Sequence, residues 1–198
     1  IDTYTAQKPI KKPLSWHLIC TILGMKELMI SLLLLLINSC GLPIISDLIE
    51  KDKETRQHNT TNPVFNSYAK SFEAAGQKNG INISTSNVPI NFGDTENANY
   101  RGICATYQDG SKEIIIQESW WNLQTEDYKE SLIYHELGHC LLGRDHHDET
   151  IAVSGQDFKT SMMNKTIISP THYSPHKESY HKELFTQQSG DIITALTK

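Results

Sequence analysis

The sequence predicts an α+β protein whose folded domain spans residues 63–198. Two observations predict this class. Apolar residues recur at helical spacing in two separate segments, near residues 65–77 and 125–142, and short apolar runs around a turn lie between them. A long loop and a last helix complete the expected order. With 198 residues, the chain has room for one ordinary domain plus appendages.

The first helix is expected from Pro63 to about Gln77. Proline fits a first helical turn, and Phe65 and Phe72 belong to a series of apolar residues at three- and four-residue steps. Gly80 then stops the helix. Residues 81–92 carry spaced apolar side chains and predict one strand or two short strands.

A β-hairpin is expected next. Apolar runs at residues 103–107 and 113–117 flank Asp109-Gly110, and this dipeptide is a strong hairpin signal because both positions of the tightest turn require positive φ. Trp120 and Trp121 follow, and we interpret them as packing residues of the core or its rim.

The second helix is expected from a cap at Thr125 to about Leu142, with Gly143 ending it. It is apolar around most of its circumference, which is typical of a buried helix. A last helix is expected over residues 177–197, with its apolar residues facing inward, namely Tyr180, Leu184 and Ile192 or Ile193.

The N-terminal part of the chain has the pattern of a targeting segment. Residues 25–39 contain an apolar run, 28–37, that is too short to span a bilayer, which takes roughly 20 residues, and fits a signal-peptide core. Ile37-Asn38-Ser39-Cys40 resembles the lipobox of bacterial lipoproteins, which implies lipidation of Cys40. One interpretation of residues 1–24, which lack a clear period, is upstream translation.

A lipidated Cys40 predicts a protein held on a bacterial membrane, either the outer membrane or the cell surface, and facing an oxidising extracytoplasmic space. Residues 40–62 end in a charged and polar run and are interpreted as a tether. The net charge of −5 gives no electrostatic case for nucleic-acid binding.

His135-Glu136-Leu137-Gly138-His139 is an H-E-x-x-H motif on the second helix. Side chains four residues apart lie on one side of a helix, so both imidazoles can reach one ion at about 2.1 Å. Glu136 is then placed to take a proton from a water molecule at that ion. The alternative is that both histidines only pack or cap.

The residues that follow carry a family resemblance. Gly143-Arg144-Asp145-His146, followed by Ser161-Met162-Met163-Asn164, resembles the metzincin zinc peptidases, whose pattern is H-E-x-x-H-x-x-G-x-x-H and then a Met-turn. The resemblance implies a zincin-like fold, a zinc cofactor and peptide hydrolysis. It also implies His146 as the third ligand, Glu136 as the base and Met163 as the Met-turn methionine beneath the metal.

The sequence departs from that pattern in one place. The stretch from His139 to Gly143 holds one residue more than the family pattern, so three candidates arise for the third ligand. His146 keeps the spacing from the glycine, Asp145 keeps the distance from His139, and His147 is adjacent. We favour His146, because imidazole is the usual zinc ligand and the glycine defines the turn. Asp145 or Asp148 is then expected to orient a ligand.

Several further residues and one strand have open roles. Cys104 and Cys140 are expected either to pair, bracing helix to sheet, or to leave Cys140 as a buried filler. A thiol that acts as a latency switch on zinc is a third alternative, which no propeptide-like segment supports. Gly138 in mid-helix is expected to give room to a neighbouring element. The strand at 113–117 is interpreted as the cleft-edge strand that pairs with extended substrates in the family. Tyr173 is not assigned to the site.

The preferred hypothesis is a monomeric, membrane-anchored zinc endopeptidase that acts on peptides or proteins. The first alternative is a non-enzymatic zinc lipoprotein that binds a partner in its cleft, and a weaker one is a zinc hydrolase of a non-peptide amide. Structural zinc sites usually have four protein ligands, so three ligands and a nearby base favour catalysis.

Overall fold

The computed structural model describes residues 55–198. The predictions for residues 1–24, for the signal peptide at 25–39 and for Cys40 lie outside this part of the chain. Among residues 55–198, no helix combines the length and the apolar character needed to cross a lipid bilayer. The elements, in order, are η1 (Pro63–Phe65), α3 (Asn66–Lys78), β1 (Ile90–Phe92), β2 (Gly102–Thr106), β3 (Lys112–Ile116), α4 (Glu118–Trp121), α5 (Glu126–Leu142), β4 (Thr150–Val153), β5 (Gln156–Lys159), α6 (Pro170–Thr186) and α7 (Gly190–Leu196).

The fold is α+β, as predicted, and its main sheet has three strands in the order β1-β3-β2. β1 pairs with β3 in parallel, and β2 pairs with β3 antiparallel, with Cys104 opposite Ile114. β3 is therefore the central strand. The interpretation of residues 113–117 as an edge strand is wrong, because β1 covers the side of β3 that faces away from β2.

The hairpin between β2 and β3 forms as predicted, but its turn differs. The Gly110 N–H donates to the carbonyl of Tyr107, and the Tyr107 N–H donates to the carbonyl of Ser111. Of the two central residues predicted to have positive φ, Gly110 does (80°) and Asp109 does not. The turn has three residues where the prediction had two, so Asp109 keeps an ordinary backbone conformation with negative φ.

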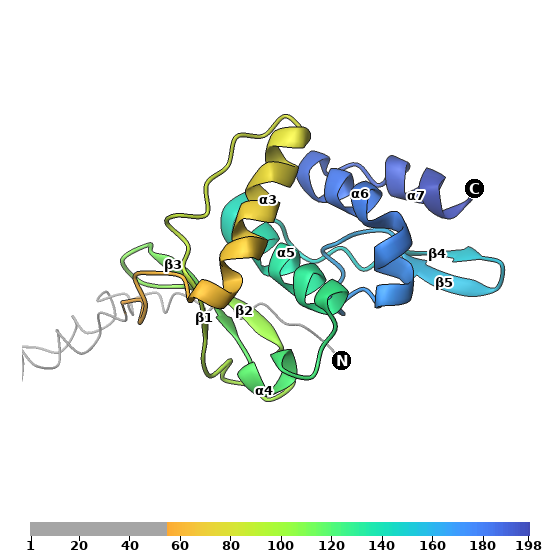
Figure 1. Cartoon of the computed structure of the whole chain (residues 1–198). Coiled ribbons are helices and arrows are strands. Elements are labelled where there is room, and N and C mark those ends of the chain that lie inside the picture. The colour runs from red at the N-terminus through yellow and green to blue at the C-terminus, as the bar shows by residue number, and fades with distance from the viewer. Residues whose placement is uncertain (1–54) are drawn as a thin grey trace, which may run out of the picture. The chain divides into compact units, whose positions relative to one another are not determined.

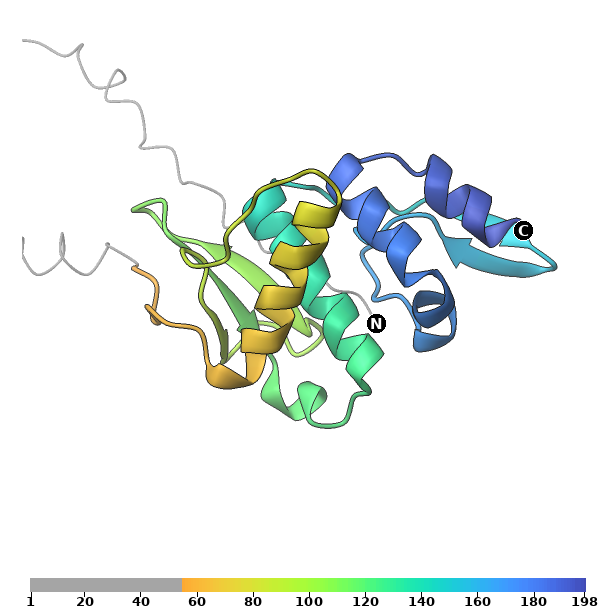
Figure 2. The same ribbon diagram turned by 45° about the horizontal axis from the view of Figure 1, so that its top comes forward.

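Helix α5 is the central element of the domain. It packs against β2 and β3 on one side and against α3 and α6 on others (Figures 1 and 2). This confirms the prediction of a buried helix. Gly143, with φ of 62°, ends it as expected. Thr125 occupies the N-cap position, but its side chain makes no capping hydrogen bond.

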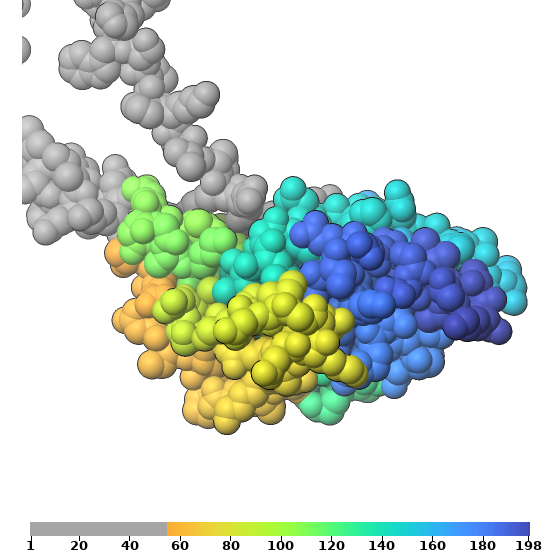
Figure 3. All heavy atoms as spheres, turned by 90° about the horizontal axis from the view of Figure 1, so that it is seen from above, coloured from red at the N-terminus to blue at the C-terminus, as the bar shows by residue number. Residues whose placement is uncertain are grey.

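Residues near position 80 pack on the C-terminal helices. Phe72 contacts the ring of Phe185, with centroids 5.0 Å apart, and Figure 3 shows the segment near residue 80 (yellow) lying against the C-terminal helices (blue). The Ile83 side chain lies against Gly76 of α3. Of the two alternatives predicted for residues 81–92, one strand or two short strands, the structure has one, at Ile90–Phe92.

The segment after α5 contains a second hairpin where a long loop was expected. β4 pairs with β5 antiparallel, and the turn is Ser154-Gly155, with φ of 52° and 79°. A Ser-Gly dipeptide is itself a turn signal. The turn signal was therefore present, but each flanking strand has only four residues, and none of these residues is buried.

The last helix is longer and is split in two. α6 begins at Pro170, seven residues before the predicted start, and ends where Gln187 adopts a φ of 59°. α7 then runs separately to Leu196. The predicted inward residues Tyr180, Leu184 and Ile192 are all buried.

The last residues of the predicted tether lie against the main sheet. Glu113 of β3 has a fully buried side chain, and its carboxylate accepts hydrogen bonds from the backbone N–H groups of Gln57 and His58, each at 3.2 Å. The His58 ring also contacts this carboxylate at 3.1 Å. The chain is thus attached to the domain before the first helix begins.

Candidate metal centre

Three histidine side chains converge at the C-terminal end of α5. The ligating nitrogens of His135, His139 and His146 all lie within 4.8 Å of one another, and no other such group of His, Cys, Asp or Glu residues occurs within residues 55–198. The Nε2 atoms of His135 and His139 are 3.0 Å apart. Two nitrogens on one tetrahedral zinc ion lie about 3.3 Å apart. The cluster therefore has the dimensions of a metal site.

The hydrogen bonds of two of these rings determine which nitrogen is free. His135 Nδ1 lies 3.0 Å from the carbonyl oxygen of Met162, and His139 Nδ1 contacts the carbonyl oxygen of Arg144. A carbonyl only accepts, so each Nδ1 carries the proton and each Nε2 keeps its lone pair. Two such lone pairs facing each other repel unless a cation lies between them.

His146 completes the set. Its Nε2 is buried and has no hydrogen-bond partner. Burial lowers the pKa of His135 well below its usual value, that of His139 to about 4, and that of His146 below its usual value as well. All three rings are therefore neutral at pH 7, which is the state that binds metal.

The turn after α5 selects the third histidine. Gly143 turns the chain out of the helix, and the Arg144 N–H donates to the carbonyl of Gly138. Asp145 is exposed and lies outside the cluster. His147 lies outside it too, with its Nε2 3.3 Å from the Glu149 carboxylate. The structure therefore brings His146, and neither alternative, to the other two histidines.

The expected orienting role of Asp148 or Asp145 is not observed. Asp148 accepts a hydrogen bond from the backbone N–H of Lys165 at 2.9 Å and thereby joins two loops. Its negative charge, with that of Asp145, partly offsets the lowering of the His146 pKa. Both acids thus act on the third histidine only through their charge.

Met163 lies directly against the helix that carries the motif. Its side chain is fully buried, and its Sδ occupies the space beside Gly138. This confirms that Gly138 gives room to a neighbouring element. The Met163 carbonyl also accepts a hydrogen bond from the backbone N–H of His147 at 2.9 Å, which ties this turn to the segment that carries His146.

Glu136 is completely buried, with an exposed fraction of 0 %. Neither carboxylate oxygen makes a hydrogen bond of normal geometry. Burial raises its pKa to about 8, and the backbone N–H of Cys104 offsets part of that rise. The side chain lies against Gly102 of β2, where an added Cβ would be 2.9 Å from its Cγ. A buried carboxylate without partners is costly, which marks it as a functional candidate.

A disulfide joins the edge strand to the motif helix. Cys104 of β2 is bonded to Cys140 of α5, with their Cα atoms 5.5 Å apart. Of the alternatives for these cysteines, the structure has the disulfide. Because Cys140 directly follows His139, this bond attaches the sheet edge next to a candidate ligand.

Sequence reasoning missed one pair of residues at this centre. Arg144 and Glu183 form a buried ion pair, with Nη2 and Oε1 2.8 Å apart. Glu183 lies on α6, far from the motif in sequence, and nothing in the local pattern distinguishes it from other polar helical residues. Only the packing of α6 against α5 places it there.

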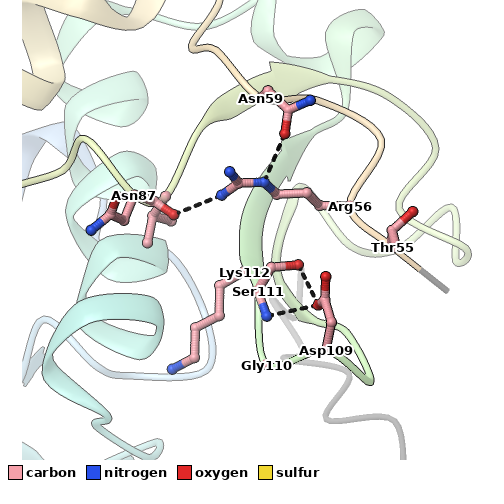
Figure 4. A pocket seen from close by; sticks show the side chains of 9 residues that line it. Thr55, Arg56, Asn59, Asn87, Asp109, Gly110, Ser111 and Lys112 are labelled. Atoms are coloured by element: carbon pink, nitrogen blue, oxygen red, sulfur yellow. Dashed lines mark hydrogen bonds between the residues drawn. The ribbon is translucent and has the colours of Figure 1, made fainter. Parts of the chain in front are cut away.

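Two other features lie apart from the cluster. Tyr173 is buried and its hydroxyl contacts His181 at 2.8 Å, in keeping with its exclusion from the site. A hollow of about 590 Å³ lies near the β2–β3 turn (Figure 4). Its charged groups are paired within the protein: Arg56 with Asn59 and the Asn87 carbonyl, Asp109 with Ser111, and Lys112 with the Cys140 carbonyl.

No protein-family model, curated protein or solved structure matches the chain. What the site shows directly is a three-histidine cluster that can bind a metal ion in an α+β domain.

Proposed function

We propose that this domain is a zinc-dependent endopeptidase of metzincin type. The observation that carries the proposal is the convergence of three neutral imidazoles on one point. The residue that follows the first of these histidines, Glu136, has a buried carboxylate without hydrogen-bond partners. His135, His139 and His146 hold the metal. Zinc bound there would polarise a peptide carbonyl and lower the pKa of a water molecule.

Glu136 acts as the general base of the reaction. Its carboxylate accepts a proton from the attacking water and delivers that proton to the amine nitrogen as the peptide bond breaks. Burial makes this carboxylate a stronger base, and the positive charge of a bound metal would keep it ionised so that it can accept the proton.

The free edge of the main sheet, at β2, is an argument for a peptide substrate. Two backbone hydrogen bonds fix which residues of β2 bond to β3. The Gln117 N–H donates to the Arg101 carbonyl, and the Tyr107 N–H donates to the Ser111 carbonyl. By alternation, the backbone groups of Gly102, Cys104 and Thr106 face the free edge, and the Cys104 N–H also lies near the Glu136 carboxylate. No other strand within residues 55–198 pairs with this edge. An extended peptide can add to it through backbone bonds alone.

We further propose that Cys40 anchors the protein to a bacterial membrane, with the domain on the extracytoplasmic side. The pairing of Cys104 with Cys140 supports this location, because disulfides persist in oxidising compartments.

The test is a cleavage assay with a library of quenched fluorescent peptides on the zinc-loaded protein, with and without a chelator. Glu136→Gln should retain zinc, measured by elemental analysis, and lose about 10²–10⁴-fold in rate. Glu126→Gln, an exposed change on the same helix, is the control and should leave the rate unchanged. Retained activity in Glu136→Gln would reject the mechanism. Zinc binding without cleavage of any peptide would favour the non-enzymatic alternative.

A further inference from the structure

The carboxylate of Glu183 is buried, with 1 % exposure, and joins two loops of the metal centre. Its Oε1 accepts hydrogen bonds from the Ser161 hydroxyl and from Arg144 Nη2, each at 2.8 Å. Its Oε2 accepts the backbone N–H of Met162 at 2.9 Å. One side chain of α6 thus holds both the turn before His146 and the turn that contains Met163.

Arg144 has a second anchor on the same helix. Its Nη1 donates to the carbonyl oxygens of Glu183 and Leu184, each at 3.0 Å. These carbonyls lie in the last turn of α6, where the end of a helix attracts positive charge, and the Glu183 carbonyl also accepts the N–H of Gln187 at 2.8 Å. The guanidinium is therefore held by a carboxylate and by the end of a helix at once.

Met162 and Arg144, the two residues that Glu183 holds, each contact one of the candidate ligands. Met162, whose N–H bonds to Glu183, offers its carbonyl to Nδ1 of His135. Arg144, whose side chain bonds to Glu183, offers its carbonyl to Nδ1 of His139. Each of these two ligand rings is thus oriented by a residue that Glu183 holds. Partners of this kind set the tautomer and the direction of a ligating imidazole.

We propose that Glu183 is a positioning residue of the metal centre and that Arg144 acts with it. Its carboxylate holds the carbonyl groups of Met162 and Arg144 where they keep the protons of His135 and His139 on Nδ1, so that both Nε2 atoms face the metal. The inference rests on metal binding by the three histidines, which is one part of the proposed function, and it does not depend on peptide cleavage.

The competing explanation is that this ion pair only stabilises the contact between α5 and α6. The chain contains a matched control for it. Glu130 of α5 is also buried, at 8 % exposure, and pairs with Lys177 of α6. It contacts neither of the two turns that carry the ligand carbonyls. Glu130→Gln therefore weakens the contact between α5 and α6 without disturbing the hydrogen bonds that Glu183 makes to the two turns.

The experiment compares Glu183→Gln with Glu130→Gln in the full chain. Zinc affinity is measured by competition with a chromophoric chelator, and the histidine tautomers of the metal-free protein are measured by long-range ¹H–¹⁵N NMR. Glu183→Gln should bind zinc about 10–100-fold more weakly, the usual effect of losing an outer partner. His135 and His139 should then populate both tautomers. Glu130→Gln should keep the wild-type affinity within about threefold and the wild-type tautomers.

Arg144→Lys is the second variant, because it keeps the charge and loses only the forked geometry. It keeps the proposal testable where Glu183→Gln does not fold, and it should shift affinity and tautomers in the same direction. Equal affinity for Glu183→Gln and Glu130→Gln would overturn the proposal, as would unchanged tautomers or a wild-type chain that binds no zinc. A protein that binds zinc and cleaves no peptide leaves the positioning role intact while refuting the peptidase.

Discussion

The Sδ atom of Met163 lies so close to Gly138 that a Cβ added to this glycine would be 2.6 Å from it, and 3.0 Å from Cδ1 of Leu184. A side chain at this mid-helix position would therefore force the buried Met163 side chain to move. A glycine inside a helix costs about 1 kcal/mol relative to alanine. The close contact with Met163 explains why a glycine is present here despite that cost.

Gly138→Ala should therefore destabilise the protein, although alanine is the better helix former. We expect the free energy of unfolding, measured in urea, to fall by about 1–3 kcal/mol, as for other overpacked core sites. Gly190→Ala is the control, because an added Cβ there meets nothing within 4 Å. A rise in stability for Gly138→Ala would mean that Met163 moves aside freely.

The choice of His146 over its two neighbours can be checked by metal binding. His146→Ala removes a ligand from the cluster and should lower zinc affinity by more than the roughly 10–100-fold typical of an outer partner. Asp145→Ala and His147→Ala should stay close to the wild-type affinity, because both side chains lie outside the cluster. The measurement is chelator competition at pH 7.5. A larger loss in either neighbour than in His146→Ala would reassign the third ligand.

The Cys104–Cys140 bond closes a loop with a sequence separation of 36 residues. The loss of chain entropy in the unfolded state predicts a stabilisation of about 4 kcal/mol for a loop of this size. The Cys104→Ala/Cys140→Ala variant should lose this amount in urea unfolding, and a thiol reductant should lower the wild-type midpoint to a similar degree. The same reductant should leave the double variant unchanged. A wild-type midpoint that resists complete reduction would contradict the prediction.

His181 predicts a pH dependence of stability. Its ring is stacked on Tyr134, and burial lowers its pKa to about 4, with the charge of Lys177 adding to the effect. The His181 ring takes up a proton below about pH 6.5 in the unfolded chain, but only below about pH 4 in the folded protein. The contribution of His181 is therefore complete above about pH 6.5 and is lost as the pH falls toward 4.

His181→Phe removes this titration and keeps a stacked ring. Between pH 7.5 and 4.5 the wild type should lose about 3 kcal/mol more than this variant, measured by urea unfolding with a chelator present. His176→Phe, a change on the same helix at a partly exposed position, should follow the wild type. Parallel pH profiles for His181→Phe and the wild type would show that the ring is protonated in the folded state.

Features that depend on near neighbours in sequence were predicted well. α3, α5 and the β2–β3 hairpin appear where the apolar spacing and the turn residues place them. The β4–β5 hairpin was missed, because each of its strands has only four residues and none of these residues is buried. The edge role of residues 113–117 was wrong, because strand order depends on β1, which pairs with β3 across a gap in sequence.

The sequence by itself determined the two candidate metal-binding histidines of the helix and the candidate base. His135, Glu136 and His139 lie within five residues of one helix, so helical geometry alone places them. Only the tertiary structure decided among His146, Asp145 and His147, paired Cys104 with Cys140, and brought Glu183 to the turns behind the ligands. Such contacts join residues far apart in the chain, and no local periodicity specifies them, because they follow from the way α6 and β2 pack around α5.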